Sequence, residues 1–230
     1  MPYEVSLLEK GLWAIRDGDV RMYLLDGGSA AFLLDTGYGS GDLRAVVSGL
    51  TGAPVTVVHT HSHEDHYGGD GQFHAFVMHE ADAAGILPHC PKDAEVRYVR
   101  EGDRIEGGTV CLTVLEIPGH TPGSIALLEP GRRLLFTGDA FARNFPVYMQ
   151  FPGQDYRQYL QGMERLAAME AEFDRICPCH GDLPFELCMM QDEIACCRSI
   201  LNGTAVDTKA RIFDGTMQRA AKYGETLIFY

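Results

Sequence analysis

The stretch VTVVHTHSHEDHYGG, residues 55–69, joins an apolar run to a cluster of histidines and acids. Residues 54–59 are continuously apolar up to the first histidine, which predicts a strand buried on both faces. His61, His63, Asp65 and His66 come directly after this strand. Imidazole and carboxylate groups together suit zinc, iron or manganese. Because a loop at the end of a buried strand can aim several side chains at one point, the stretch predicts a metal site.

The segments on both sides of this stretch predict a sheet-rich fold. Short β-rich runs at 12–15, 20–25 and 30–35 are separated by Asp-Gly and Gly-Gly turns, a pattern typical of an antiparallel meander. Residues 42–50 carry apolar side chains at helical spacing. Further strands are expected at residues 75–78, 109–117, 124–128 and 134–136.

The last third of the chain predicts two helices and closing strands. One apolar stripe with helical spacing runs through Tyr156, Leu160, Met163 and Ala167. A second stripe runs through Leu187, Ile194, Cys197 and Leu201 and ends at Asn202-Gly203. Residues 211–213 and 227–230 are expected as closing strands. Together the patterns indicate an α/β fold of two sheets with helices on the outside, formed by a single domain over residues 1–230.

Composition narrows the classes of partner. The 230 residues carry 19 Lys and Arg against 32 Asp and Glu, a net charge of −13, without a basic stripe. Such a balance argues against nucleic acid and anionic lipid surfaces. No apolar run is long enough to cross a bilayer. A small-molecule substrate is the remaining expectation, and the sequence leaves the oligomeric state open.

The expected compartment follows from the N-terminus and the cysteines. The first residues show neither a basic region nor an apolar region typical of a signal peptide. Seven cysteines, an odd number without a recognisable framework, favour reduced thiols. We therefore expect a cytoplasmic protein.

Four more motifs occur in chain order with the histidine cluster. They are LDTG at 34–37, PGHTPGS at 118–124, FTGD at 136–139 and CHG at 179–181. With the stretch at 60–69, this set resembles the metallo-β-lactamase-fold hydrolases. The resemblance covers residues 34–181 and implies an αββα sandwich of two mixed sheets flanked by helices.

The resemblance implies a dinuclear site. His61, His63 and His120 would hold the first metal, Asp65, His66 and His180 the second, and Asp139 would bridge both. Asp35 would orient a ligand without binding metal. Two divalent ions bring four positive charges and the two aspartates return two, which favours a bridging hydroxide near neutral pH. Zinc is the expected metal, with iron or manganese as alternatives.

Two neighbouring residues are predicted to lie outside the ligand set. His59 could begin an alternative pattern with His61, but no Asp-His pair follows at the required spacing. We therefore expect His59 to support the site or the fold. Cys179 could be a thiolate ligand, but its position beside His180 favours a side chain that points away.

The third motif decides among the branches of the family. Antibiotic-hydrolysing members that resemble this pattern usually carry cysteine where this chain has Asp139, so β-lactam hydrolysis is disfavoured. The resemblance favours the glyoxalase II and lactonase-like branch, in which the bridging hydroxide, oriented by Asp65, attacks a small ester, thioester or lactone. The alternatives are an iron-dependent persulfide dioxygenase and a non-catalytic metal-binding scaffold.

The segment after Asp139 predicts where the substrate lies. Residues 141–153 contain four aromatic residues and two prolines without helical or strand periodicity. We expect this loop either to pack as scaffold or to form an apolar wall. In the second case Tyr148 would donate a hydrogen bond to the developing oxyanion, and Arg143 would bind an anionic tail.

Overall fold

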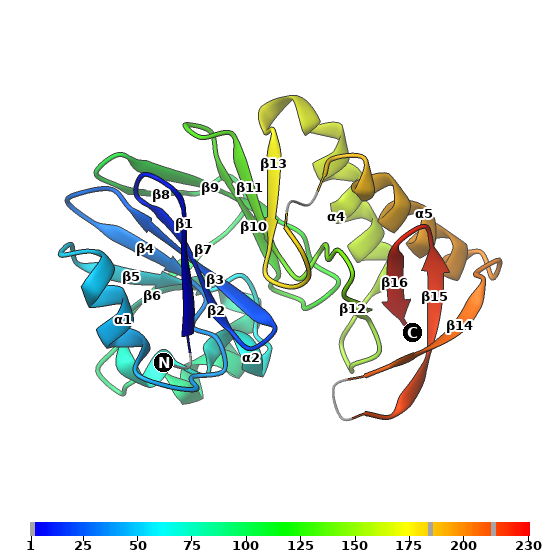
Figure 1. Ribbon diagram of the computed structural model, residues 1–230, viewed down its shortest axis with the longest axis horizontal. Coiled ribbons are helices and arrows are strands. Elements are labelled where there is room, and N and C mark those ends of the chain that lie inside the picture. The colour runs from blue at the N-terminus through cyan, green and yellow to red at the C-terminus, as the bar shows by residue number, and fades with distance from the viewer. Residues whose placement is uncertain (1–2, 184–185, 213–214) are drawn as a thin grey trace.

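The computed structural model describes residues 3–183, 186–212 and 215–230, which form three sheets (Figure 1). The first sheet has seven strands in chain order: β1 (Tyr3–Glu9), β2 (Leu12–Asp17), β3 (Val20–Asp26), β4 (Ala31–Leu34), β5 (Val55–Val58), β6 (Ala75–His79) and β7 (Glu95–Val99). β1 to β4 pair antiparallel through tight turns, and β4 to β7 pair parallel. β2, β3, β4 and the strand before the histidine cluster are thus where the sequence predicted them, whereas β1 was not predicted.

The second sheet has five strands in the order β13-β11-β10-β9-β8. Their bounds are β8 (Arg104–Gly107), β9 (Val110–Glu116), β10 (Ile125–Glu129), β11 (Leu134–Gly138) and β13 (Arg175–Pro178). β13 pairs parallel to β11, and the other pairs are antiparallel. Both sheets are therefore mixed, as expected.

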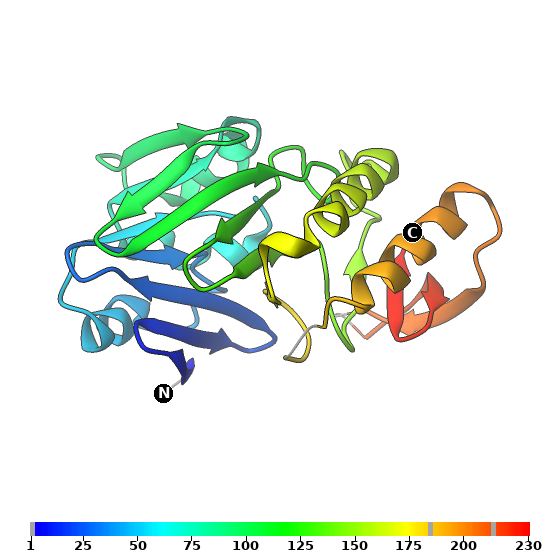
Figure 2. The same cartoon turned by 90° about the horizontal axis from the view of Figure 1, so that it is seen from above.

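The two large sheets stack face to face, as Figure 2 shows from above. Their shared core contains Tyr23 and Val58 from the first sheet and Leu127 and Phe136 from the second. The rings of Tyr23 and Phe136 meet edge to face at 5.0 Å between centroids. Burial of these apolar faces against each other is the main stabilisation of such a sandwich.

Helices cover the outer faces of both sheets. The α-helices are α1 (Leu43–Leu50), α2 (Glu64–Tyr67), α3 (Ala83–Ile86), α4 (Tyr156–Ala168) and α5 (Met189–Leu201), and the short 3₁₀ helices are η1 (Asp70–Gln72), η2 (Glu80–Asp82), η3 (Leu87–His89) and η4 (Glu170–Glu172). Leu43 and Val47 of α1 pack on the first sheet, and Met163 and Leu166 of α4 pack on the second. The αββα architecture is confirmed. None of the described helices is both long and apolar enough to span a membrane.

A third sheet was not predicted as a separate unit. It has the order β12-β16-β15-β14, with β12 (Val147–Tyr148), β14 (Asp207–Arg211), β15 (Met217–Tyr223) and β16 (Thr226–Phe229). β16 corresponds to the closing strand expected at 227–230. Of the strand expected at 211–213, Arg211 ends β14, and Phe213 lies outside the described residues. β12 joins the aromatic loop to this sheet by parallel pairing with β16.

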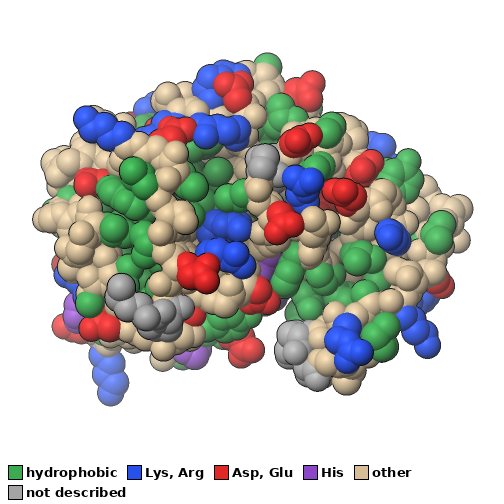
Figure 3. Space-filling model, viewed as in Figure 1, with side chains coloured by type: hydrophobic (Ala, Val, Ile, Leu, Met, Phe, Trp, Pro, Cys, Tyr) green, Lys and Arg blue, Asp and Glu red, His purple; other side chains and the backbone are tan. Residues whose placement is uncertain are grey.

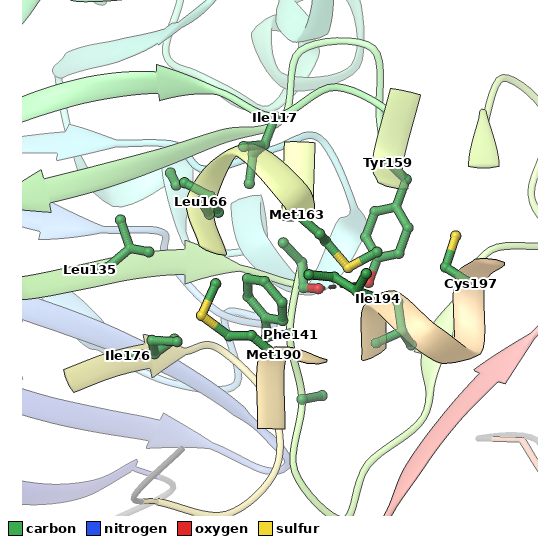
Figure 4. Close-up of a cluster of buried hydrophobic side chains, with 14 of the residues drawn as sticks. Ile117, Leu135, Phe141, Tyr159, Met163, Leu166, Ile176, Met190, Ile194 and Cys197 are labelled. Atoms are coloured by element: carbon green, nitrogen blue, oxygen red, sulfur yellow. Dashed lines mark hydrogen bonds between the residues drawn. The ribbon is translucent and has the colours of Figure 1, made fainter. Parts of the chain in front are cut away.

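One core cluster connects the second sheet to the C-terminal segment. Figure 4 shows Ile117 above Leu166 and Met163 of α4, with Met190 and Ile194 of α5 below them. Tyr159 donates a hydrogen bond from its hydroxyl to the Ala140 carbonyl at 2.6 Å. Figure 3 shows a hollow between the two-sheet part and the C-terminal sheet, with apolar side chains along its C-terminal border.

Candidate metal centre

The seven residues expected as ligands all follow the carboxyl ends of strands. His61, His63, Asp65 and His66 follow β5, His120 follows β9, Asp139 follows β11 and His180 follows β13. β9, β11 and β13 run in one direction, since β10 is antiparallel to both of its neighbours and β13 is parallel to β11. Their carboxyl ends therefore meet at one edge of the second sheet.

The structure brings these seven side chains together in two groups of four. One group is His61, His63, His120 and Asp139, and the other is Asp65, His66, Asp139 and His180. Within each group the candidate ligand atoms lie within 4.8 Å of one another. Asp139 belongs to both groups: its Oδ1 lies 3.3 Å from His66 Nε2, and its Oδ2 lies 3.5 Å from His120 Nε2. The arrangement is that of a dinuclear metal site with one shared carboxylate.

Buried lone pairs face the centre of this arrangement. Among the described residues, Nε2 of His61, His66 and His120 and Oδ1 of Asp139 are buried and have no hydrogen-bond partner. Buried polar atoms are normally paired, so several unpaired atoms around one point indicate a cation site. Imidazole nitrogens and carboxylate oxygens are the donors that divalent metals such as zinc take in proteins. The residues present therefore fit a metal.

The protonation states of two ligands, His61 and His63, also suit metal binding, whereas, despite burial, nearby carboxylates raise the pKa values of His66 and His180. Burial lowers the pKa of His61 well below its ordinary value and that of His63 to about 3. Both rings are therefore neutral at pH 7, the state in which a ring nitrogen can bind a metal. Burial opposes ionisation of Asp139, but the imidazoles of His180 and His66 outweigh it and hold its pKa well below the usual range.

Asp35 lies behind the site and orients it, as expected. Its Oδ2 accepts hydrogen bonds from His66 Nδ1 at 2.8 Å and from the Thr60 hydroxyl at 2.7 Å, and its Oδ1 accepts from the Thr60 backbone N–H. The proton on His66 Nδ1 leaves Nε2 free to face the centre. Cys179 also lies near Asp35 and His66. Because the Asp35 oxygens already accept these hydrogen bonds, we interpret this trio as support for the site.

His59 is placed in the same supporting layer and belongs to neither ligand group. Its Nε2 lies 3.0 Å from Asp70 Oδ2, and its Nδ1 lies 3.6 Å from Asp35 Oδ1. Burial alone would lower the pKa of His59, but these two carboxylates raise it to about 9. A protonated His59 between two acids thus helps to hold Asp35 in place.

Two supporting residues were missed by sequence reasoning. Asp82, at the end of η2, accepts hydrogen bonds from the Thr121 hydroxyl at 2.6 Å and from Gly123 N at 2.8 Å. It therefore holds the loop that carries His120. The second is Asp19, whose backbone carbonyl accepts from His180 Nδ1 at 3.1 Å. No local signal marks either residue, because the Asp82 contacts span about 40 positions and Asp19 contributes only its backbone carbonyl, 161 positions from His180.

The site opens into a cavity of about 520 Å³, a usual size for a small-molecule site. Five of the seven candidate ligands line it. The aromatic residues of the lining are Tyr38, Tyr67, Phe145, Tyr148 and Phe151. The loop after Asp139 therefore forms a wall of the cavity, and Tyr148 lies in it.

Arg143 does not lie where the loop prediction put it. Its side chain lines a separate, smaller cavity with Glu186, Asp192 and Glu225, and its Nε lies 3.7 Å from Glu225 Oε2. The reason is tertiary: the backbone of Arg143 forms an isolated bridge with Gly181, and its side chain lies near Glu225 in the C-terminal sheet region. The prediction that Arg143 binds an anionic substrate tail is therefore wrong.

Comparison with known proteins identifies the family. The sequence model described as "Metallo-beta-lactamase superfamily" matches residues 15–180. The chain belongs to this superfamily. The matched range includes all seven candidate ligands, whereas α5 and most of the third sheet lie beyond it.

Curated relatives in the superfamily match only parts of the chain. The acyl-coenzyme A thioesterase MBLAC2 of Gallus gallus is 31% identical over 56% of this chain and 56% of its own length. A hydroxyacylglutathione hydrolase of Fuscovulum blasticum is 37% identical over 35% of this chain and 31% of its own length. The chain thus spans about half or less of these relatives.

Among solved structures, a metallo-beta-lactamase from Pontibacter korlensis superposes with a TM-score of 0.71 at 19% identity. The superposition covers 85% of this chain and 99% of that structure. At this identity the likeness shows the metallo-beta-lactamase fold alone.

Proposed function

We propose that this protein is a dinuclear metal-dependent hydrolase that cleaves an ester, thioester or lactone bond of a small molecule. The observation that carries the proposal is the pair of ligand groups that share Asp139. A non-catalytic scaffold would need neither a second group nor an open cavity beside it. Two ions held by one shared carboxylate are typical of hydrolytic centres.

Zinc is the metal that we propose, with iron or manganese as alternatives. His61, His63 and His120 would hold one ion, Asp65, His66 and His180 the other, and Asp139 both. When bound, such ions lower the pKa of coordinated water and polarise a carbonyl oxygen.

The protein's own residues orient the ligands and the attacking water and supply a hydrogen-bond donor. Asp35 and Thr60 fix the rings of His66 and His61, since the Thr60 hydroxyl also lies 3.0 Å from His61 Nδ1. The Asp65 carboxylate lines the cavity, where it can orient the attacking water. Tyr148 lines the same cavity. Its hydroxyl can donate a hydrogen bond to the substrate's carbonyl oxygen, which gains negative charge when the acyl carbon is attacked.

Two further observations support an acyl bond as the target. The relatives named above are an acyl-coenzyme A thioesterase and a hydroxyacylglutathione hydrolase, and both names describe hydrolysis of an acyl compound. Asp139 stands where the antibiotic-hydrolysing branch usually carries cysteine, which argues against a β-lactam substrate.

The test combines metal analysis with a substrate panel. Protein purified without added metal is analysed for bound ions and then assayed, metal-loaded, on esters, thioesters, lactones and a persulfide while oxygen is monitored. We expect about two ions per chain and release of acid without oxygen uptake. Oxygen consumption with the persulfide would select the dioxygenase alternative. A single ion under metal-replete conditions, with Asp65 and His180 uncoordinated, would contradict the dinuclear assignment.

A further inference from the structure

Three aromatic side chains form one continuous wall of the cavity: Phe145, Tyr148 and Phe151. The Tyr148 ring stacks on Phe151 and tilts against Phe145, with 6.2 Å between centroids in both cases. Phe145 in turn stacks on the His180 imidazole at 4.5 Å, and Phe151 meets His63 edge-on at 5.6 Å. The aromatic wall therefore contacts one candidate ligand from each group.

This wall is formed before any substrate arrives. The Gln154 side chain donates to the Tyr148 carbonyl at 2.8 Å and accepts from Phe151 N at 2.7 Å. The Tyr156 hydroxyl donates to the carbonyls of Met149 and Phe229 and so ties the loop to β16. Because the loop is held from both sides, an apolar group can bind to it without a large ordering cost.

The charged part of the lining is one-sided. Apart from the candidate ligands, the charged side chains that line the cavity are Asp19 and Glu64. No lysine or arginine lines it among the described residues, and the residues outside the described ranges include none either. The Asp19 carboxylate is held in place, since Tyr38 donates its hydroxyl hydrogen to Oδ1 at 2.9 Å.

The consequence concerns the part of a substrate that extends beyond the reacting carbonyl. Two bound divalent ions would outweigh Asp65 and Asp139 and leave a positive surplus at the reacting carbonyl, whereas Asp19 and Glu64 belong to neither ligand group and line the cavity around it. A tail that extends past the reacting carbonyl would meet these two carboxylates, and no lysine or arginine among the described lining residues offsets them there. A cleft lined by one sign of charge changes the local concentration of charged ligands by about 10-fold or more.

We propose that this protein acts on uncharged acyl compounds with an apolar acyl part, and that acyl donors with anionic leaving groups are poor substrates. The inference rests on the proposed hydrolase function and specifies its substrate class. Phe145, Tyr148 and Phe151 bind the apolar part by burying it, and Asp19 and Glu64 discriminate against anions. The preference differs from what the names of the curated relatives suggest, since coenzyme A and glutathione are both anionic thiols.

A matched set of thioesters tests the preference. The phenylacetyl thioesters of N-acetylcysteamine, glutathione and coenzyme A share the acyl group and the scissile bond, and only the first is uncharged. For the metal-loaded protein we expect kcat/KM to be about 10-fold or more higher for the uncharged thioester at low ionic strength. Added salt should narrow the gap, because it screens the exposed carboxylates.

Two variants assign the preference to residues. Glu64→Lys should raise the ratio of kcat/KM for the coenzyme A thioester to that for the uncharged thioester by about 10-fold. Glu95→Lys, the same charge change on the exposed surface of β7, should leave this ratio unchanged. Phe151→Ala should lower kcat/KM for the phenylacetyl thioester by about 10-fold relative to the acetyl thioester, since less apolar surface is buried.

A binding measurement separates this inference from the proposed function. The metal-loaded protein is titrated calorimetrically with non-hydrolysable thioester analogues, in which a methylene group separates the carbonyl from the sulfur. One analogue is uncharged and the other is built on coenzyme A. Tighter binding of the uncharged analogue supports the inference. Equal or better hydrolysis of the anionic thioesters contradicts the inferred substrate preference but agrees with the proposed hydrolase function. Preferential binding of the uncharged analogue without turnover of any ester, thioester or lactone retains the ligand preference and overturns the hydrolase.

Discussion

At the scale of single residues, Asp139 is the position where one atom change should affect both halves of the site. Its oxygens contact both groups: Oδ1 lies 3.3 Å from His66 Nε2, and Oδ2 lies 3.5 Å from both His120 Nε2 and His180 Nε2. Asp139→Asn keeps the volume but removes the shared charge, so we expect activity to fall by about 100-fold or more. Metal content should fall from about two ions per chain toward one, while circular dichroism shows an intact fold.

The control for this variant is Asp93→Asn, which removes the same charge from an exposed side chain. It should keep both ions and the activity of the wild type. Near-normal turnover in Asp139→Asn, with two ions still bound, would show that Asp139 does not bridge.

Tyr148 belongs to the same scale, because its predicted role depends on one hydroxyl group. Tyr148→Phe keeps the aromatic wall and removes the donor to the developing oxyanion, so kcat should fall by about 10-fold while KM changes little. Arg143→Ala is the matched comparison, since Arg143 faces the other cavity and should leave KM unchanged. Wild-type kinetics for Tyr148→Phe on the true substrate would contradict the catalytic role of the hydroxyl and show that the loop only supports the fold.

At the scale of elements, the loop between β9 and β10 depends on a distant carboxylate. Asp82, only 3% exposed, accepts from both Thr121 and Gly123. Asp82→Ala removes hydrogen bonds to a charged group and should cost about 2 kcal/mol, or roughly 4–8 °C in Tm for a chain of this size. Because the loop carries His120, metal affinity should fall as well.

Asp82→Asn is the control variant, because its amide oxygen can still accept a hydrogen bond from Gly123 N while the negative charge is lost. It should recover most of the metal affinity lost in Asp82→Ala. If Asp82→Ala lowers Tm but binds metal as tightly as the wild type, the carboxylate stabilises the fold without positioning His120.

The elements also show which parts of this site a sequence can reveal. The ligand clusters were predictable because each joins an apolar strand to a short motif of chemically specific residues, as residues 55–66 do. Asp82 and the Asp19 carbonyl were not, because their contacts depend on the folded chain alone. β14 and β15 were hidden for a different reason: most of their side chains are exposed, so neither DTKAR nor MQRAAKY alternates apolar with polar residues. The placement of Arg143 failed because the direction of a loop side chain is set by its tertiary partners.

At the scale of the whole molecule, a buried acid on α5 links stability to pH. Glu193 is 1% exposed and accepts from Ala142 N at 3.1 Å. No described ion pair includes it, and burial raises its pKa well above the ordinary 4.5. Above about pH 4.5 the unfolded chain loses this proton while the folded chain keeps it. The free energy of unfolding should therefore fall as pH rises from 4.5 toward the folded pKa, by at most about 1.4 kcal/mol per pH unit.

Glu193→Gln removes this titration and keeps the hydrogen bond to Ala142 N. Chemical denaturation of both proteins, equally metal-loaded, at pH 5, 6, 7 and 8 should show the variant gaining stability relative to the wild type as pH rises. Parallel curves would mean that Glu193 ionises equally easily in the folded and unfolded chain.

The same core predicts that residues 1–230 unfold as a single unit. One buried cluster runs from Ile117, beside β9, through Ile194 of α5 to Ile228 of β16 (Figure 4 shows Ile117 and Ile194). Ile194→Ala opens this cluster and should cost about 2–5 kcal/mol. Trp13, the one tryptophan, lies on β2 in the first sheet and reports on the opposite end of the molecule. If the chain is one cooperative unit, Trp13 fluorescence and far-ultraviolet circular dichroism should shift together in the variant, by roughly 5–15 °C. A shift in circular dichroism alone, with the Trp13 transition unmoved, would show instead that α5 and the third sheet unfold as an independent domain.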